Sequence, residues 1–200
     1  MPSEPYSETI AVPAAVRFPV ELLPPPGFRP EAPGTWPKVP GRLEYVQGKL
    51  LYMPPCGAVQ QGVSVSVVGI LDRWLEHHPE LFVGGNEAGM LLGGDARGAE
   101  AAVWRRDALG PLTDRYVRVP PLLAVEVAGH EEGEPELREK ARWYLAHGVR
   151  AVWLVLPATR EVMVVTTDGE TRHGAHDHLP PHPALPGLAP PVERFFRQLA

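Results

Sequence analysis

The fold is decided by one stretch of the chain: LLAVEV at 122–127, a polar segment from Glu134 to His147, and AVWLVL at 151–156. The two outer runs are short and almost wholly apolar, which is typical of buried strands. The middle segment has proline at its second position, acids in its first turn and Gly148 just past its end, and these signals bound a helix. Strand, helix and strand form a βαβ unit, whose right-handed crossover makes the two strands parallel in one sheet.

The segments before this unit predict a hairpin, a helix and several short strands. Residues 43–46 and 49–53 flank Gln47-Gly48, where glycine supplies the positive φ of a tight turn. The apolar spacing from Val59 to His77 predicts a helix, because the segment is too long for a strand. Short strands are expected at 81–83, 89–92 and 101–104, and the glycines between 84 and 98 are interpreted as those of flexible loops.

The segments after the βαβ unit complete the domain. A further strand is expected at 161–167, and the proline-rich residues 179–191 lead to a short terminal helix around Phe195 and Phe196. No repeat with a period of 20–50 residues is visible, which excludes solenoids and propellers. The predicted fold class is therefore mixed α/β.

Proline divides the chain of 200 residues into two unequal parts. Of 25 prolines, 11 lie in residues 1–40. Proline has no N–H to donate, so this region is expected to be an extended arm outside the central sheet. Its scattered aromatic and aliphatic residues favour packing on the body over complete disorder. We therefore predict a proline-rich arm at 1–39 and one globular domain at 40–200, which is long enough to bury a core.

Charge and cysteine content limit the classes of function. A net charge of -5 argues against a nonspecific nucleic-acid binder, although a local basic groove is still allowed. The single cysteine, Cys56, excludes an intramolecular disulfide and the cysteine cages of structural zinc. No window approaches the roughly 20 apolar residues that span a bilayer. We expect a cytoplasmic protein without a membrane partner.

Several common catalytic motifs are absent. The chain has no G-x-x-x-x-G-K-[ST] loop, no G-x-G-x-x-G turn between strand and helix, and no G-x-S-x-G elbow. Cys56 follows two prolines and has no partner histidine that the sequence can nominate. Phosphate-loop, dinucleotide and nucleophilic enzymes are therefore disfavoured.

Two acids stand inside apolar runs. Glu126 lies within LLAVEV, and an unpaired buried charge there would be strongly destabilising, so a compensating group is required. Glu100 precedes the run AAVW at 101–104. If the two strands are neighbours, the carboxylates converge on one hard cation. The alternative is an arginine partner for Glu126 and a solvated strand end for Glu100.

Lys140 is the basic residue that geometry singles out. On the helix at 134–147 it falls at the edge of the apolar face, beside Tyr144, from where it can reach inward toward Glu126. A surface lysine whose stem covers apolar area is the alternative. The histidines at 173, 176, 178 and 182 lie in a short segment rich in glycine and proline, without fixed metal-ligand spacing, so metal binding there is disfavoured. His130 is expected to be a solvated loop histidine, and the alternative is that it approaches a site at the end of the Glu126 strand.

These pieces resemble a bacterial family of putative restriction endonucleases within the PD-(D/E)XK nuclease superfamily. The resemblance spans residues 40–197. It rests on the order and spacing of Arg42-Leu43-Glu44, Gly48-Lys49-Leu50, Met53-Pro54, Arg97 to Val103, Pro121 to Val127, Leu137, Lys140, Tyr144, Gly148-Val149, Val152 to Val155 and Leu185 to Leu188. It implies a restriction-endonuclease-like α/β fold in which helices flank a mixed central sheet.

The resemblance also implies a site. Glu100, Glu126 and the main-chain carbonyl of Val127 would hold Mg²⁺ or Mn²⁺, which activates water and stabilises charge on a phosphate. Lys140 would orient the nucleophile or stabilise the transition state. Glu44 would be an accessory acid on the N-terminal side.

The chain departs from the family pattern at several positions. Ala99-Glu100 stands where proline-aspartate is usual, Ala128 where the superfamily has a lysine, and Gly129-His130 where serine-proline is usual. Glu136 replaces an aspartate, and Gln60 replaces a histidine. The extra methylene at residue 100 moves a carboxylate by about 1 Å, and a displacement of that order can lower a rate about 100-fold.

Two functions are therefore expected. The leading hypothesis is a metal-dependent endonuclease that hydrolyses DNA phosphodiester bonds. The alternative is a catalytically silent nuclease-fold protein that serves as a DNA-binding or protein-interaction module. Residues 138–150 carry four basic residues against one acid, which fits a helix facing a duplex or a solvated helix equally well. DNA is the expected partner, and a homodimer is left open.

Overall fold

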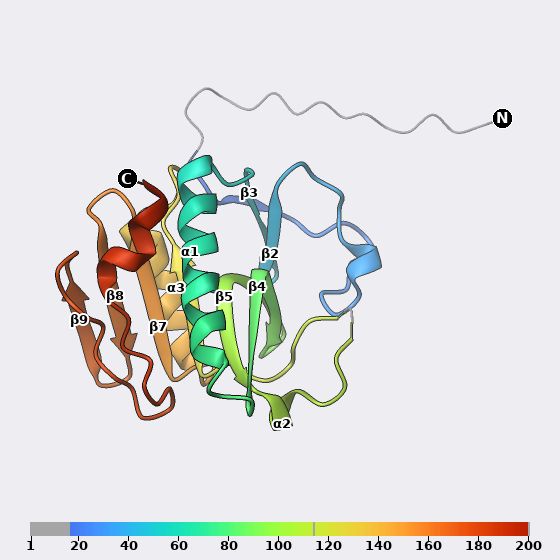
Figure 1. Cartoon of the computed structure of the whole chain (residues 1–200). Helices are drawn as coiled ribbons and strands as arrows, with labels where there is room; N and C mark the ends of the chain where they lie inside the picture. The colour runs from blue at the N-terminus through green and yellow to red at the C-terminus, as the bar shows by residue number, and fades with distance from the viewer. Residues whose placement is uncertain (1–16, 114, 200) are drawn as a thin grey trace.

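A mixed β-sheet forms the centre of the computed structural model, which describes residues 17–113 and 115–199 (Figure 1). Its strands are β1 (Val20–Leu22), β2 (Arg42–Val46), β3 (Lys49–Met53), β4 (Leu81–Leu92), β5 (Asp95–Arg105), β6 (Leu123–Val127), β7 (Ala151–Leu156), β8 (Glu161–Thr166) and β9 (Gly169–His173). Its helical elements are η1 (Pro33–Thr35), α1 (Ala58–Leu75), α2 (Arg106–Leu109), α3 (Glu134–Ala146) and η2 (Val192–Leu199). Hydrogen-bonded neighbours in the sheet follow the order β1-β3-β2-β5-β6-β7-β8-β9. β4 is outside this linear order and pairs with β5.

The βαβ unit predicted around residues 122–156 is present. β6 pairs in parallel with β7, with Leu123 opposite Ala151 and Val127 opposite Val155. Every residue of both strands is buried, as their apolar composition predicts. α3 connects them and packs on both. The mixed α/β fold class is therefore confirmed.

Apolar side chains pack on both faces of the sheet, which α1 and α3 cover from opposite sides (Figure 1). With α1 lies η2, the expected short terminal helix in 3-10 form, which buries Phe195. On the other face α3 packs Leu137, Ala141 and Tyr144 against Ala124 and other positions of β6 and β7. Because side chains alternate along a strand, the carboxylate of Glu126, two residues after Ala124, also points toward α3.

Residues 81–105 form one long hairpin, so the interpretation of the glycines at 84–98 as flexible loops is wrong. β4 and β5 pair antiparallel along almost their whole length and turn at Gly93-Gly94, where both φ angles are positive. A strand glycine here makes room for a ring, since a Cβ at Gly84 would lie 2.9 Å from the Trp104 side chain. Glycine in a strand marks such close approach, which composition alone does not separate from a loop.

A β-bulge interrupts this hairpin beside Glu100. Asn86 and Glu87 of β4, with φ of 54° and 59°, stand opposite the single residue Glu100 of β5. Bulges bend a strand and re-aim its side chains, and they occur often beside active sites. Here the bulge lets the carboxylates of Glu87 and Glu100 meet the same guanidinium, that of Arg42.

The described part of the proline-rich arm, residues 17–39, packs on the domain. β1 pairs antiparallel with β3, so it lies at the border of the sheet. The Phe28 ring lies 5.0 Å from the Tyr45 ring of β2 between centroids. The expectation that the arm lies outside the sheet is therefore wrong for residues 20–22, which form an edge strand, a position where a neighbouring proline costs no ladder hydrogen bond. Residues 1–16 lie outside the described residues, and the domain boundary at residue 40 stays a prediction.

The sequence does not predict β9 at the opposite border. Its residues, GETRH, are polar and four of the five are exposed, so no apolar alternation marks them as a strand. Backbone pairing with β8 holds the segment in place. In the part of the chain that the structure describes, no helix is long and apolar enough to cross a membrane.

Candidate functional site

Two neighbouring strands bring Glu100 and Glu126 to the same part of the sheet. β5 and β6 pair antiparallel with Ala101 opposite Val125, so the two glutamates are the next residues along this pair of strands. Both are buried, with exposed fractions of 8% for Glu100 and 2% for Glu126. The alternative that Glu100 marks a solvated strand end is therefore wrong.

Glu126 is compensated by two side chains of α3. The Tyr144 hydroxyl donates to Oε1 at 2.6 Å, and Lys140 Nζ donates to Oε2 at 3.2 Å. All three side chains are buried. The prediction that Lys140 points toward Glu126 is thus confirmed. The partner is the lysine of the following helix and not the arginine of the alternative.

Burial governs the protonation of this trio. It raises the pKa of Glu126 to about 7, against the lowering effect of Lys140. Burial disfavours the charged form of Lys140, but the carboxylates of Glu126, Glu44 and Glu132 outweigh it and raise the lysine's pKa. Burial and the Glu126 charge raise the pKa of Tyr144 well above its usual value. At neutral pH the lysine is therefore charged and the tyrosine is a neutral donor.

Glu132, in the loop before α3, holds Lys140 from the other side. Its Oε1 lies 2.8 Å from Lys140 Nζ, and its Oε2 lies 3.9 Å from Arg42 NH2. Glu132 thereby links α3 to β2. Sequence reasoning missed it, because nothing in the sequence distinguishes it from Glu131 beside it.

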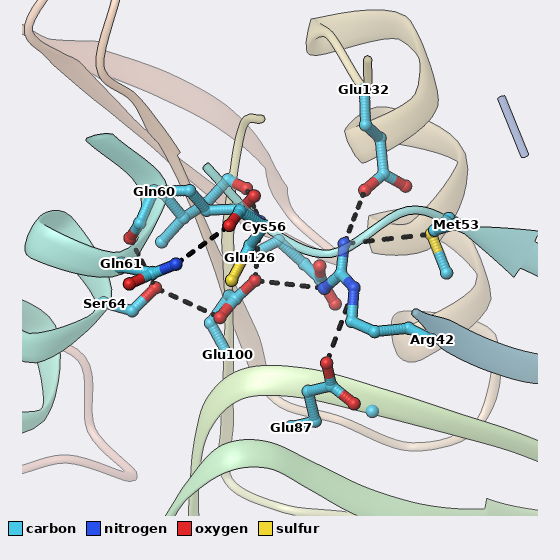
Figure 2. Close-up of polar contacts among 12 residues, drawn as sticks. Arg42, Met53, Cys56, Gln60, Gln61, Ser64, Glu87, Glu100, Glu126 and Glu132 are labelled. Atoms are coloured by element: carbon cyan, nitrogen blue, oxygen red, sulfur yellow. Dashed lines mark hydrogen bonds and ion pairs between the residues drawn. The ribbon is translucent and has the colours of Figure 1, made fainter. Parts of the chain in front are cut away.

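Glu100 is surrounded by hydrogen-bond donors (Figure 2). Its Oε1 accepts from Gln60 Nε2 at 2.7 Å and from Arg42 NH1 at 3.2 Å, and its Oε2 accepts from the Ser64 hydroxyl at 3.0 Å. Gln60 and Ser64 are one turn apart on α1, so one face of that helix serves this carboxylate. Arg42 Nε also lies 3.5 Å from Glu87 Oε1, a second acid that sequence reasoning missed.

The Gln60 amide also contacts the third expected ligand. Its Nε2 donates to the carbonyl oxygen of Val127 at 3.1 Å as well as to Glu100. One atom is thus within hydrogen-bond distance of both oxygens, which shows that the carboxylate and the carbonyl converge on a common point. Gly129 leaves space for the amide, since a Cβ there would lie 2.9 Å from Gln60 Oε1.

Glu44 lies on β2 beside this cluster and lines a cavity of about 150 Å³. Its Oε1 accepts from the Gly98 amide at 3.3 Å, and its Oε2 lies 3.6 Å from Arg97 Nε. The Arg97 guanidinium also lies 5.3 Å from the centre of the Trp143 ring. The polar contacts of Glu44 in the described residues are therefore with β5, and it adds negative charge to the cluster from one side.

The cluster contains more acid than base. Three cations, Arg42, Arg97 and Lys140, face five carboxylates, those of Glu44, Glu87, Glu100, Glu126 and Glu132. Fully ionised, these groups hold two negative charges in excess, which is unfavourable because all the carboxylates except the half-exposed Glu87 are buried. Burial accordingly raises the pKa of Glu87 as well as that of Glu126.

The oxygen donors of the cluster fit a hard divalent cation. Carboxylate and carbonyl oxygens are the ligands that Mg²⁺ and Mn²⁺ prefer, and two positive charges would balance the excess. Among residues 17–113 and 115–199, no group of three or more His, Cys, Asp and Glu side chains is arranged to hold a metal. An ion here would therefore depend on the Val127 carbonyl in addition to Glu100 and Glu126.

His130, in the loop between β6 and α3, is exposed to solvent, as the sequence predicts.

The Uma2 family model, described as putative restriction endonuclease, matches residues 35–193. The chain belongs to this family. The resemblance inferred from the sequence is thereby confirmed, and the match includes every residue of the cluster described above. No curated protein matches this Uma2 protein.

One solved structure with a strong likeness is that of a putative nuclease belonging to DUF820 from Anabaena variabilis ATCC 29413. The similarity covers 82% of the Uma2 protein and 95% of that chain, with a TM-score of 0.72 and 14% sequence identity. At this identity the likeness shows the fold, which is the nuclease-type mixed sheet flanked by helices that the sequence predicts.

Proposed function

We propose that this Uma2 protein is a metal-dependent endonuclease that hydrolyses DNA phosphodiester bonds with Mg²⁺ or Mn²⁺. One observation carries the proposal: Lys140 lies between Glu126 and Glu132, and Glu100, which stands opposite Glu126 in the sheet, converges with the Val127 carbonyl on one point. A charged lysine on one expected cation ligand, with two further hard oxygen ligands on the neighbouring residues, is suited to phosphoryl chemistry, in which positioned charges stabilise the developing anion.

Each side chain has a role that follows from its contacts. A divalent ion held by Glu100, Glu126 and the Val127 carbonyl would supply an activated water and charge stabilisation at the phosphate. Lys140 keeps its proton at neutral pH, so it serves as a fixed positive charge and hydrogen-bond donor, not as a general base. Tyr144 fixes the orientation of the Glu126 carboxylate through its hydroxyl.

The second candidate function is a catalytically silent module that binds DNA or another protein. It is favoured by the saturation of the two expected metal ligands with protein donors. Glu126 already has Lys140 and Tyr144, and Glu100 already has donors from α1 and β2. A buried carboxylate with complete hydrogen bonding is stable without an ion.

Nicking of supercoiled plasmid DNA separates the two functions. We expect the wild-type protein to nick the plasmid in the presence of Mg²⁺ or Mn²⁺, and we expect EDTA to abolish this nicking. Lys140→Met should lower the rate about 100-fold or more, as does loss of one charge-stabilising group elsewhere. Lys49→Met is the matched control, because Lys49 is half-exposed on β3 and pairs with Glu21.

Thermal melting checks that both lysine variants are folded, and Glu126→Gln serves as a second variant that should stop nicking. A folded wild type that nicks in neither ion contradicts the endonuclease and favours the silent module.

A further inference from the structure

Gln60 differs from the other donors around Glu100 because its side chain can also accept. A carboxamide carries an NH₂ donor and a carbonyl acceptor on the same carbon, whereas a guanidinium or an ammonium only donates. The torsion that carries the amide is broad and roughly two-fold, so a half-turn exchanges Nε2 and Oε1. The same side chain can therefore hydrogen-bond two oxygens or join them as a third oxygen ligand.

The position of Gln60 makes both states available at the cation site. Nε2 lies 2.7 Å from Glu100 Oε1 and 3.1 Å from the Val127 carbonyl, so it bridges two of the three expected ligand oxygens. The side chain is buried, with 5% exposed, and it projects from α1, whose backbone is fixed by helical hydrogen bonds. Its movement is limited to the amide, beside the space left by Gly129.

We propose that Gln60 is the residue that sets the cation preference of this site. Without a cation its Nε2 bridges Glu100 and the Val127 carbonyl by hydrogen bonds, and after a half-turn of the amide its Oε1 takes that position and becomes the third ligand of a cation that both oxygens bind. The inference rests on the cation site of the proposed function. Gln60 Oε1 completes a set of oxygen ligands, which favours Mg²⁺ and Mn²⁺, whereas the imidazole of a histidine at position 60 would favour Ni²⁺.

The test is the ratio of cation affinities in variants at position 60. Isothermal titration of the full-length protein with Mg²⁺, Mn²⁺ and Ni²⁺, together with the thermal shift that each ion causes, measures binding without relying on activity. Gln60→His should raise the Ni²⁺ affinity relative to Mg²⁺ by about tenfold or more, the scale on which groups around a metal change its affinity. Gln60→Glu should tighten Mg²⁺ and Mn²⁺ binding by a similar factor.

Gln61→His is the matched control. Gln61 is the next residue of α1, is exposed, and donates to the Cys56 carbonyl instead of to the cluster. A histidine there adds the same group to the same helix away from the site, so its affinity ratio should equal that of the wild type. The histidines at 173–182 are common to all variants, and any Ni²⁺ that they bind cancels in the comparison.

The outcomes separate this inference from the proposed function. If the wild type binds Mg²⁺, Gln60→His keeps the wild-type ratio of Ni²⁺ to Mg²⁺ affinity, and Gln60→Glu keeps the wild-type Mg²⁺ and Mn²⁺ affinities, the assignment of Gln60 is overturned and the cation site stands. If neither the wild type nor Gln60→Glu binds Mg²⁺ or Mn²⁺, the cation site itself is overturned, and this inference with it. Should Gln60→His fail to fold, the Gln60→Glu titration decides alone.

Discussion

Glu126 shows how one buried carboxylate couples the fold to pH. Its pKa in the folded chain is about 7, against an ordinary value of 4.5, because burial disfavours its charged form. The folded state therefore holds this proton more tightly than the unfolded state. In EDTA, the contribution of Glu126 to the free energy of unfolding should fall as pH rises from about 4.5 to about 7 and then stay level, a change on the order of 3 kcal/mol.

The variant Glu126→Gln isolates this effect, because the amide keeps the shape of the side chain and does not titrate. Urea unfolding at several pH values between about 5 and 8 should show a smaller loss of stability with rising pH in the variant than in the wild type. Acids outside the cluster contribute equally to both proteins and cancel. Parallel stability profiles would show that the Glu126 carboxylate does not titrate in this range.

The candidate site could be predicted at those residues whose own neighbours in sequence mark them. Glu126 stands in a wholly apolar strand, and Lys140 stands on a helix that must fold back over that strand. Glu87 and Glu132 have no such mark. Glu87 reaches Arg42 only because a bulge turns it there, and that bulge depends on pairing between strands and not on local pattern.

At the scale of elements, the glycines of β4 are explained by what packs on them. A Cβ at Gly84 would lie 2.9 Å from the Trp104 ring, which is almost fully buried. Gly84→Ala should therefore destabilise the fold by about 1–3 kcal/mol through overpacking. At Gly34 nothing lies within 4 Å of an added Cβ, so Gly34→Ala should change stability by less than about 0.5 kcal/mol. Thermal melting of both variants tests this, and equal stability would mean that the ring moves aside freely.

The elements that the sequence predicts well are those held by local signals. β6, α3 and β7 each carry their own apolar period or caps, and α1 lies within two residues of its predicted bounds. The hairpin of β4 and β5 and the exposed strand β9 depend on partners far away in the chain. The glycines of β4 make room for a neighbouring ring, and the polar residues of β9 are held by pairing with β8. Only the fold brings these partners together, so the local sequence does not predict either element.

For the whole molecule, the distribution of charge matters more than its total. The net charge is -5, and among the described residues four of the acids, Glu44, Glu100, Glu126 and Glu132, are buried in the cluster instead of facing solvent. On α3, Arg138 is paired with Glu134 and Glu170, while Arg142 is exposed, and Arg150 is exposed just before β7. This arrangement agrees with a local basic surface on an acidic protein.

The arm tests how the whole domain is assembled. Deletion of residues 1–39 removes β1, but β1 lies at the border of the sheet and every other strand pairing remains. We expect cooperative thermal unfolding to persist. The midpoint should fall, because the deletion also removes the contacts of Phe28 with Tyr45 and of Trp36 with Tyr116. A loss of roughly 1–3 kcal/mol corresponds to about 2–12 °C in a domain of this size.

A full-length variant with Phe28→Ala and Trp36→Ala is the control for this deletion, because it keeps β1 and removes only the two rings. Its midpoint should fall between those of the wild type and the deleted chain, since the rings and the β1–β3 pairing contribute separately. Tyr116 lines the cavity beside Glu44, so the arm covers a wall of that cavity through Trp36. If the deleted chain unfolds without a cooperative transition, the arm is an integral part of the core, and the division of the chain at residue 40 is wrong.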